Sequence, residues 1–440
     1  MDQNLSLEQV EAFRSNYASS PMSQVMTRAA SKTALNDICY STEAAARMNH
    51  KFSVEVTTHG ITDQKSSGRC WLFAALNILR EEVCKDLNLD SFELSQSYLS
   101  FYDHLEKANS FLEKIIETAA EPLDDRKVYK LLDSPVGDGG WWEYFQGLCR
   151  KYGVVPKEAM KETYQSSNTA SMNGLISMQL RQYAMDIRRE MAEGASAQQI
   201  REEKPRMLNK IYNILAICLG EPPVRFDFEY VDKDKAYHAD RDLTPKAFFD
   251  KYIHRDVSSI VSILTCPGED RPYGKTFVIE NEESIRGQNP VKALNLSLED
   301  FKAAVIRQLQ GGDPIWFSCD CHPYGYRKEG IWDTEIFDFA TPFDLDIRMT
   351  KEELLKSHES APNHVMLLTG VNLVDGKPDK WKIENSWGDE WGHKGYYIMS
   401  DRWFDLYVYF ACIDRKYLTE QQNRDFDQEP LVLAPWDRLA

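Results

Sequence analysis

The stretch QKSSGRCWLFA (residues 64–74) joins a polar turn that contains a glycine to an apolar segment. Residues 70–87 are rich in helix formers and begin with apolar side chains nearly all round, which predicts a buried helix that starts at Cys70. The N-terminus of a helix stabilises negative charge, so a thiol there is biased toward the thiolate that attacks carbonyl carbons. The amide of Gln64 is placed to donate a hydrogen bond to an oxyanion that develops beside the sulfur.

Taken alone, Cys70 is better explained as one more buried free thiol, because cysteine is among the residue types most often buried. A thiolate nucleophile also needs a base, and the base needs a group that orients it. The catalytic interpretation therefore requires a histidine, together with an asparagine or an aspartate, elsewhere in the chain.

Both residues appear downstream in two apolar segments. The segment PNHVMLLTG (362–370) places His364 at the mouth of a strand, and WKIENSWG (381–388) places Asn385 at the end of the next strand. If the two strands are neighbours in one sheet, Asn385 accepts a hydrogen bond from one ring nitrogen of His364 and leaves the other nitrogen aimed at the thiol. We expect Trp387 to screen this contact from water.

Each of these features also has a simpler explanation. Most histidines in a chain are structural, and the segment 385–396, rich in glycine and tryptophan, is also typical of a tight hairpin. Of the nine histidines, however, only His364 is followed by a properly spaced asparagine in the next strand. In combination with Gln64 and Cys70, the pattern favours the catalytic interpretation over the simpler ones.

The rest of the chain divides by pattern. Residues 7–17 predict a short amphipathic helix, followed by an irregular stretch to about residue 60. The region 100–295 is more polar and predicts mostly helix, for example at 180–191 and 205–219, and a further helix is expected at 298–309. Short strands are expected after it, at residues 314–319, 364–374, 381–387, 395–400 and 406–413. Helices first and an antiparallel sheet later indicate an α+β architecture.

Composition and charge disfavour several classes of function. The 440 residues carry a net charge of -17, which argues against binding to nucleic acid. We see neither a signal peptide nor an apolar run of the ~18 residues that a membrane helix needs, so we expect a cytoplasmic protein without a membrane partner. Nine cysteines without the spacing of a disulfide framework fit reduced thiols there. Residues 319–322 (CDCH) lack the two ligand pairs of a structural zinc site, and no motif indicates another metal or a cofactor.

Five segments together resemble the bleomycin hydrolase and aminopeptidase C family, a cytosolic branch of the papain superfamily. They lie at residues 64–74, 138–142 (DGGWW), 314–317 (PIWF), 363–364 (NH) and 384–388 (ENSWG). The matches run from about residue 30 to the C-terminus, so the resemblance covers nearly the whole chain. It implies a papain-like cysteine peptidase that hydrolyses peptides through a thioester acyl-enzyme.

The resemblance also implies a role for each motif residue. Gln64 is the implied oxyanion donor, Cys70 the nucleophile, His364 the acid and base, and Asn385 the residue that orients the histidine. His364 follows Cys70 by 294 positions (364 minus 70), against about 130–150 in papain, and the excess corresponds to the helical insertion. The alternative from another class is a binding protein on an inactive papain-like fold, which would require one of these four positions to be chemically incompetent.

The implied fold is α+β, a papain-like cysteine peptidase fold in which a helical subdomain and an antiparallel β subdomain are enlarged by a large helical insertion. The family assembles as a ring-like homohexamer whose active sites face an internal cavity, so self-association is expected. The expected parts are an N-terminal extension (1–60), the helical subdomain with the nucleophile (61–150), a mainly helical, oligomerising insertion (151–295), the β-rich subdomain with the histidine and asparagine (296–430) and a C-terminal arm in the active-site cleft (431–440).

Four further residues are expected at the peptide substrate. Gly139 and Gly140 resemble the superfamily's glycines that let a substrate backbone approach, although a plain turn explains them nearly as well. Trp387 is expected beside the histidine. In the family the terminal carboxylate, here that of Ala440, meets the free amino group of the substrate and enforces aminopeptidase action.

The length of the C-terminal tail leaves the position of cleavage open. The family's tail carries about six residues after its Trp-Asp pair, whereas this chain carries only Arg438, Leu439 and Ala440, so its reach is about 10 Å shorter. Aminopeptidase action is therefore expected, with endopeptidase or oligopeptidase action as the alternative.

Overall fold

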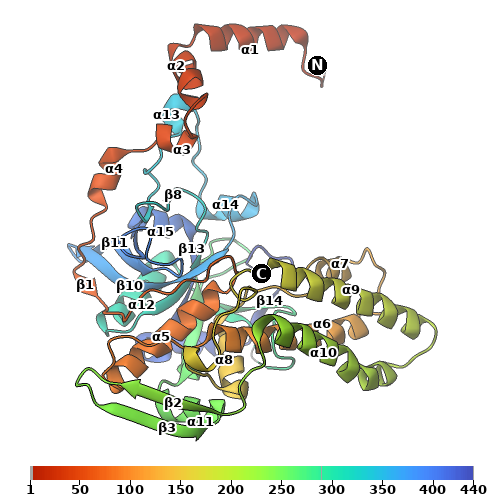
Figure 1. Ribbon diagram of the computed structural model, residues 1–440. Coiled ribbons are helices and arrows are strands. Elements are labelled where there is room, and N and C mark those ends of the chain that lie inside the picture. Colours follow the sequence, from red (N-terminus) through yellow and green to blue (C-terminus); the bar gives the residue numbers. More distant parts are fainter. Residues whose placement is uncertain (1–2, 289, 440) are drawn as a thin grey trace.

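The computed structural model describes residues 3–288 and 290–439, and its N-terminal helices form an arm that stands away from the body (Figure 1). Helix α1 (Leu7–Ser19) confirms the first predicted helix. The prediction of an irregular stretch after it is wrong for residues 21–47, which form α2 (Pro21–Ala30), α3 (Leu35–Ile38) and α4 (Thr42–Arg47), whereas residues 48–60 are largely irregular as expected. The side chain of Ser20 caps α2 and Pro21 takes its first position, which together are a start signal for a helix.

The nucleophile segment opens a buried helix. Helix α5 (Cys70–Asp86) begins at Cys70, as predicted, and is buried without interruption as far as Arg80. A helix that is apolar on every side is stable only when other elements surround it. Its neighbours in the helical layer are α6 (Gln96–Glu117) and α8 (Trp142–Tyr152), and α7 (Arg126–Asp133) packs on α6.

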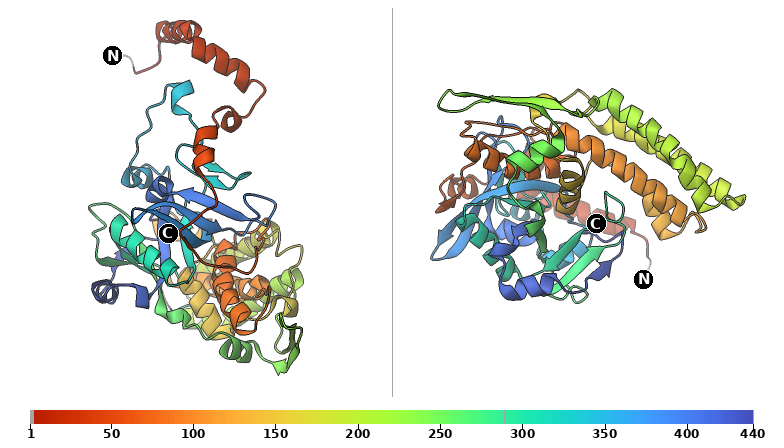
Figure 2. Two further views of the ribbon diagram at one scale, coloured as in Figure 1. Left: turned by 90° about the vertical axis from the view of Figure 1, so that its left-hand side faces the viewer. Right: turned by 90° about the horizontal axis from the view of Figure 1, so that it is seen from below.

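Two long helices extend sideways from the body (Figures 1 and 2). Helices α9 (Ala170–Ala192) and α10 (Ala197–Leu219) confirm the helices predicted there, and both pack on α6. The following segment, read from the sequence as mostly helical, is instead rich in strands, because short apolar runs such as IVSIL do not distinguish a buried strand from a buried helix by periodicity. Its elements are β2 (Phe226–Val231), β3 (Tyr237–Leu243), α11 (Pro245–Tyr252), β4 (Ile260–Leu264), β5 (Lys275–Ile279) and β6 (Lys292–Asn295).

One large sheet runs through the body in the strand order β14-β5-β6-β4-β13-β7-β10-β11-β12-β9-β8, with β1 paired to β10. Pairing is antiparallel from β4 through β13, β7, β10 and β11 to β12, but β4–β6, β5–β14 and β9–β12 are parallel. The expected antiparallel sheet is therefore corrected to a mixed sheet, because strands from distant parts of the chain join it. The strands not yet given are β1 (Val54–Glu55), β7 (Ile315–Cys319), β8 (Gly325–Tyr326), β9 (Ile331–Trp332), β10 (His364–Val374), β11 (Lys377–Glu384), β12 (Tyr396–Ser400), β13 (Val408–Asp414) and β14 (Leu431–Leu433).

Strand β10 is covered by helices on both faces. Val365 and Leu367 belong to the apolar cluster that contains α5, whereas Met366 and Leu368 belong to the cluster that contains α12 (Leu298–Gln310), the helix predicted there. This alternation places the start of β10 where the helical layer meets the sheet. The remaining helical elements are η1 (Lys157–Ala159), η2 (Val257–Ser259), α13 (Ala340–Phe343), α14 (Lys351–Lys356), α15 (Asp401–Tyr407), η3 (Arg415–Tyr417) and α16 (Glu420–Phe426).

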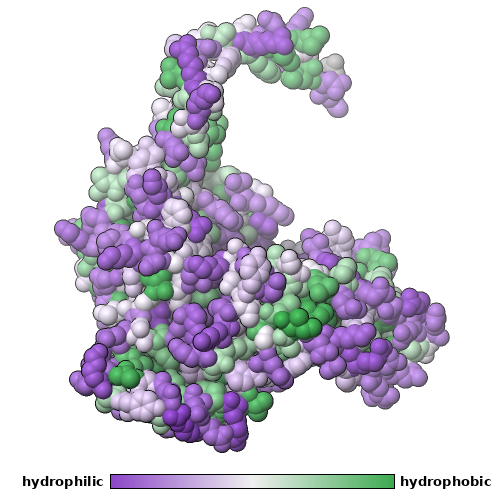
Figure 3. All heavy atoms as spheres, viewed as in Figure 1, coloured by the Kyte–Doolittle hydropathy of each residue, from purple (hydrophilic) through white to green (hydrophobic). Residues whose placement is uncertain are grey.

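The surface seen in Figure 3 is mainly hydrophilic, with apolar side chains among the polar ones on the N-terminal arm. On α1, Leu7, Phe13 and Tyr17 are 88%, 56% and 47% exposed. The amphipathic helix thus keeps an apolar face exposed in the single chain. Among the helices of the described residues, none is both long enough and apolar enough to cross a membrane.

Candidate active site

A cavity of about 520 Å³ opens between the helical layer and the sheet. Its lining contains three of the predicted site residues, Gln64, Cys70 and His364, together with both predicted glycines. The nucleophile segment and the histidine are far apart in the sequence. They meet because apolar residues of β10 pack in the same cluster as α5.

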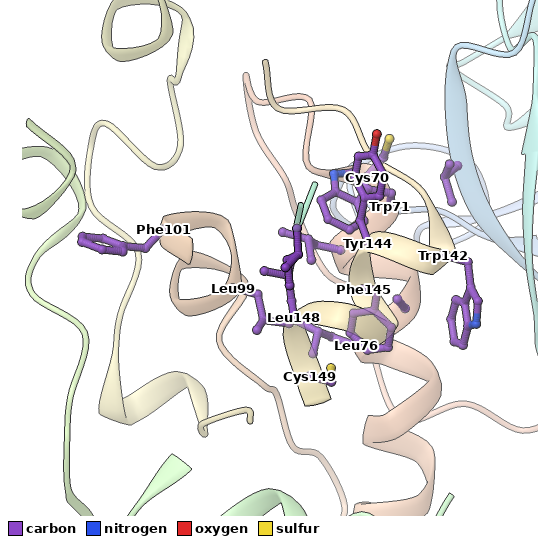
Figure 4. Close-up of a cluster of buried hydrophobic side chains, with 14 of the residues drawn as sticks. Cys70, Trp71, Leu76, Leu99, Phe101, Trp142, Tyr144, Phe145, Leu148 and Cys149 are labelled. Atoms are coloured by element: carbon purple, nitrogen blue, oxygen red, sulfur yellow. The ribbon is translucent and has the colours of Figure 1, made fainter. Parts of the chain in front are cut away.

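Cys70 occupies the N-terminus of α5 and is 8% exposed. Burial raises the pKa of its thiol to about 11, whereas backbone hydrogen bonds at Val365, Trp71 and Cys70 itself act to lower that pKa. Cys70 and Trp71 lie at the N-terminus of α5, which offers such donors to an anion, whereas Val365 lies on β10. Figure 4 shows Cys70 next to Trp71, whose ring meets that of Tyr144 of α8 edge to face.

His364 is the first residue of β10, and Asn385 directly follows the neighbouring strand β11. The predicted hydrogen bond is present, with 3.0 Å between Nε2 of His364 and Oδ1 of Asn385. Because Oδ1 also accepts from the N–H of Ser386, it acts as an acceptor, so Nε2 carries the proton and Nδ1 keeps its lone pair. Burial lowers the pKa of His364 to about 4, although the bond to Asn385 acts to raise it.

Trp387 lies over the histidine, as expected. Its ring is stacked on that of His364 with centroids 4.7 Å apart and an interplanar angle of 23°. The guanidinium of Arg327 lies 4.9 Å from the centroid of the Trp387 ring. The indole therefore limits both the movement and the hydration of the imidazole.

The side-chain amide of Gln64 is held in one orientation. Its Oε1 accepts a hydrogen bond of 2.6 Å from the hydroxyl of Ser386, and its Nε2 donates one of 2.5 Å to the carbonyl of Ser67. The amide has a second N–H, and Gln64 lines the same cavity as Cys70. That N–H is an available donor for an anion formed next to the sulfur.

The two predicted glycines differ in their surroundings. A Cβ atom added to Gly140 would lie 2.5 Å from the ring of Trp71, whereas one added to Gly139 would have open space within 4 Å. Close packing against the indole alone therefore accounts for Gly140. Gly139 lines the cavity, and the space beside its Cα is open.

The C-terminal segment runs beside the cavity. Strand β14 pairs with β5, and Pro435 contributes to the cavity lining. Oδ2 of Asp437 pairs with a guanidinium nitrogen of Arg271 at 2.5 Å, and Leu439 is buried. The predicted substrate contact at Ala440 lies outside the described residues.

Several charged residues of the cavity were not predicted. They lie on α6, on α7 and in the segment between β5 and β6, and no sequence motif connects them. Their common feature is a charged group on the cavity wall, provided by Lys107, Lys114, Lys127, Lys130, Glu282 and Glu283.

Two further cysteines, Cys319 and Cys321, lie near Cys70. Burial raises the pKa of Cys321 to about 12 and that of Cys319 well above its usual value. Among the described residues no group of three or more His, Cys, Asp or Glu side chains is arranged to hold a metal ion.

Comparison with known proteins places the chain among peptidases. The model of the Peptidase C1-like family matches residues 4–440. Aminopeptidase C of Lactobacillus delbrueckii subsp. lactis is 42% identical over 443 residues, which cover 100% of this chain and 99% of that protein. Aminopeptidase C of Listeria monocytogenes is 39% identical over 440 residues, with 100% and 99% covered.

A solved structure agrees with this match. The crystal structure of PepW from Lactobacillus rhamnosis HN001 (DR20) has a TM-score of 0.98 and 42% sequence identity to this chain, and the match covers 100% of this chain and 99% of that one. The resemblance predicted from five short motifs is thereby confirmed. The chain belongs to the Peptidase C1-like family, in its bleomycin hydrolase and aminopeptidase C branch.

Proposed function

We propose that this chain is a thiol aminopeptidase, with Cys70 as nucleophile, His364 as general base and acid, Asn385 as the residue that orients His364, and Gln64 as oxyanion donor. The observation that carries the proposal is the 3.0 Å hydrogen bond between His364 and Asn385. It leaves Nδ1 of the imidazole as proton acceptor at the cavity that also holds the thiol. Relatives named aminopeptidase C, similar over their full length, support an exopeptidase.

Acylation begins when Nδ1 of His364 takes the proton of the thiol while the sulfur of Cys70 bonds to the carbonyl carbon and the carbonyl electrons move onto oxygen. The oxyanion accepts hydrogen bonds from the Cys70 N–H and from Nε2 of Gln64. When it collapses, the amine leaves with the proton of His364 and a thioester remains. Water that loses a proton to His364 then cleaves the thioester and restores the thiol.

The electrostatics of the buried pair indicate how the charges arise. Burial raises the pKa of Cys70 to about 11 and lowers the pKa of His364 to about 4, so it opposes a lone thiolate and a lone imidazolium alike. Transfer of one proton from sulfur to Nδ1 creates both charges together, and each then stabilises the other. The backbone donors at the start of α5 add to the stabilisation of the thiolate.

The replacement Cys70→Ala tests this assignment. We expect it to abolish the hydrolysis of an aminoacyl fluorogenic amide and to leave the circular dichroism spectrum unchanged, because the attacking atom is lost while alanine is well tolerated at a helix start. Retained turnover would exclude Cys70 as nucleophile. Selective labelling of Cys70 by iodoacetamide at mildly acidic pH distinguishes an active peptidase from an inactive binding protein on the same fold.

We also propose that residues 431–440 form an arm that measures the substrate from its free amino group. The arm is supported by Pro435 at the cavity wall and by the ion pair between Asp437 and Arg271. We assign the carboxylate of Ala440 as the group that pairs with the substrate ammonium. Endopeptidase or oligopeptidase action is the second candidate.

Paired substrates decide between the two candidates. An aminoacyl fluorogenic amide with a free amine and an N-acylated peptide amide are compared on the intact enzyme and on an enzyme lacking residues 438–440. Strict dependence on the free amine that the truncation relaxes supports the arm as a ruler. Equal or better cleavage of the blocked substrate by the intact enzyme supports an endopeptidase instead.

The organisation of the molecule is proposed on the same basis. We infer a papain-like fold with a helical part (61–150) and a sheet part (296–430), enlarged by an N-terminal extension (1–60) and an insertion (151–295). The exposed apolar face of α1 and the family's assembly support a homohexamer. Nine cysteines without a disulfide bond support a reducing, cytoplasmic location.

A further inference from the structure

A buried group of charges lies beside the proposed nucleophile and has no part in the chemistry above. It consists of Asp103, His104 and Lys107 on α6 and of Asp138 in the loop before α8. The side chains of Asp103, His104 and Asp138 are 1%, 0% and 8% exposed. Charges this deep in a protein are retained only when each has a partner.

Asp138 contacts the nucleophile segment on both sides of Cys70. Its Oδ2 accepts a hydrogen bond of 2.7 Å from the backbone N–H of Gly68, and its carbonyl accepts one of 2.6 Å from the indole N–H of Trp71. A Cβ atom on residue 68 would lie 2.9 Å from Cβ of Asp138. The approach of Asp138 thus explains why a glycine precedes the nucleophile by two positions.

The same carboxylate also accepts hydrogen bonds from residues at the start of α9. The hydroxyl of Thr169 donates to Oδ2, and Nδ2 of Asn173 donates to Oδ1 at 2.7 Å. Asp138 therefore connects the long helical hairpin to the turn that precedes α5. A neutral side chain in its place would not bring the same charge-assisted hydrogen bonds to that turn.

The contacts of His104 require it to carry two protons. Nδ1 lies 2.8 Å from the carbonyl of Ser100, and Nε2 lies 2.9 Å from Oδ1 of Asn173 and 3.3 Å from Oδ1 of Asp138. Asn173 has to turn its NH₂ group toward the carboxylate, so its oxygen faces the imidazole. Both ring nitrogens then face acceptors, which makes the ring an imidazolium.

The charges around His104 agree with this protonation. Burial acts to lower the pKa of His104, but Asp138 and Asp103 outweigh it, and the net effect is a raised pKa. Lys107 acts in the opposite direction and is itself bound by Asp103. The four groups thus form two ion pairs, with His104 held to Asp138.

We propose that Asp138 is a positioning residue of this active site, which holds the turn carrying Gln64 and Cys70 in its catalytic geometry, and that protonated His104 keeps Asp138 ionised there. The inference rests on the proposed cysteine peptidase function. The mechanical connection is short. Ser67, next to the Gly68 that Asp138 holds, bonds both the side-chain amide and the carbonyl of Gln64.

The hydrogen bonds of the Asp138 carboxylate favour catalysis because they hold the turn in place, whereas its negative charge disfavours the thiolate of Cys70. The negative charge of Asp138 acts to raise the pKa of Cys70. Its removal is therefore expected to make the thiol more acidic while it loosens the oxyanion donor. Lys107 and His364 line the same cavity as Cys70, and Cys319 and Cys321 lie near it; the substitution alters none of these side chains.

The replacement Asp138→Asn tests the proposal. We expect kcat to fall about tenfold or more with KM within about twofold, because a transition-state donor is lost rather than ground-state binding. At the same time the pH midpoint for alkylation of Cys70 by iodoacetamide moves to lower pH. A folded variant with kcat within about twofold of wild type, or with an alkylation midpoint that does not fall, overturns the proposal.

A second variant and a matched control keep the test decisive. If Asp138→Asn does not fold, Thr169→Val removes one hydrogen bond to the carboxylate and keeps both shape and charge. A fall in kcat of about threefold or more with an unmoved alkylation midpoint then supports the proposal, and an unchanged kcat overturns it.

Asp313→Asn is the matched control. Asp313 also forms an ion pair, at 2.6 Å from Arg255, but it does not line the cavity, so this variant should leave kcat unchanged. Failure of the proposed function appears separately, as hydrolysis by the Cys70→Ala enzyme.

Discussion

Asn385 holds the imidazole of His364 by one hydrogen bond, while Trp387 lies nearly flat against the same ring. The replacement Asn385→Ala removes the hydrogen bond and leaves the stacking, so the base keeps part of its orientation. We expect kcat/KM to fall about ten- to hundredfold, against a loss of at least about a thousandfold for His364→Ala. Rates on a fluorogenic amide at equal concentrations of folded enzyme measure both. A silent Asn385→Ala would mean that another group orients His364.

Glu143 is a second residue whose surroundings lead to a measurable effect. It is 7% exposed, the hydroxyl of Ser262 donates to its Oε1 at 2.7 Å, and its Oε2 is buried without a partner among the described residues. Burial raises its pKa from 4.5 to about 7. The pKa of Glu143 is higher in the folded than in the unfolded protein. The contribution of this residue to the free energy of unfolding is therefore fully present below pH 4.5 and is lost as the pH rises through about 7.

Glu143→Gln removes this titration and keeps the shape. We expect the variant to exceed wild type in free energy of unfolding by about 1–3 kcal/mol at pH 8 and to match it closely at about pH 5. Urea unfolding followed by circular dichroism at the two pH values measures the difference. A stability difference that is the same at both pH values would contradict a buried, titrating carboxyl group.

At the scale of elements, the turn before α8 (Trp142–Tyr152) offers a matched pair of glycines. Gly140→Ala would place a methyl group 2.5 Å from the ring of Trp71, and we expect a loss of about 2 kcal/mol or more in the free energy of unfolding. Gly139→Ala meets open space, so stability should change by less than about 1 kcal/mol. If the substrate main chain passes at Gly139, the same variant raises KM.

Thermal unfolding and steady-state kinetics of the two glycine variants separate packing from binding. Equal destabilisation by both substitutions would contradict the different roles given to the two positions. An unchanged KM for Gly139→Ala would remove Gly139 from the proposed substrate contacts.

At the scale of the whole molecule, the projecting arm is the part that the single chain does not bury. Six chains of 50.8 kDa would run at about 305 kDa in light scattering, and we expect this mass for the intact protein. Phe13 is 56% exposed on α1, so Phe13→Glu should lower the assembled mass without changing thermal unfolding of the body. Arg14→Ser, on the same helix, is the control. A monomer at micromolar concentration would exclude the assembly and leave the chemistry untouched.

Much of the site could be predicted because its signals are local. The helix that starts at Cys70, the strand that starts at His364 and the asparagine after the next strand are each encoded within about ten neighbouring residues, through apolar periodicity and the chemistry of short motifs. The family match follows from the same residues. The helix at residues 298–310 also has its cap beside it, at Ser297.

Only the tertiary structure decided what depends on distant segments. The strands β4 to β6 were missed because a short apolar run becomes a strand only when other strands pair with it, and the parallel pairs of the sheet arise in the same way. The charged wall of the cavity comes from elements without a common motif. Asp138 stood within a recognised motif, yet its contacts with Gly68, His104 and Asn173 became visible only in the fold, because a buried charge is stabilised by partners that are distant in sequence.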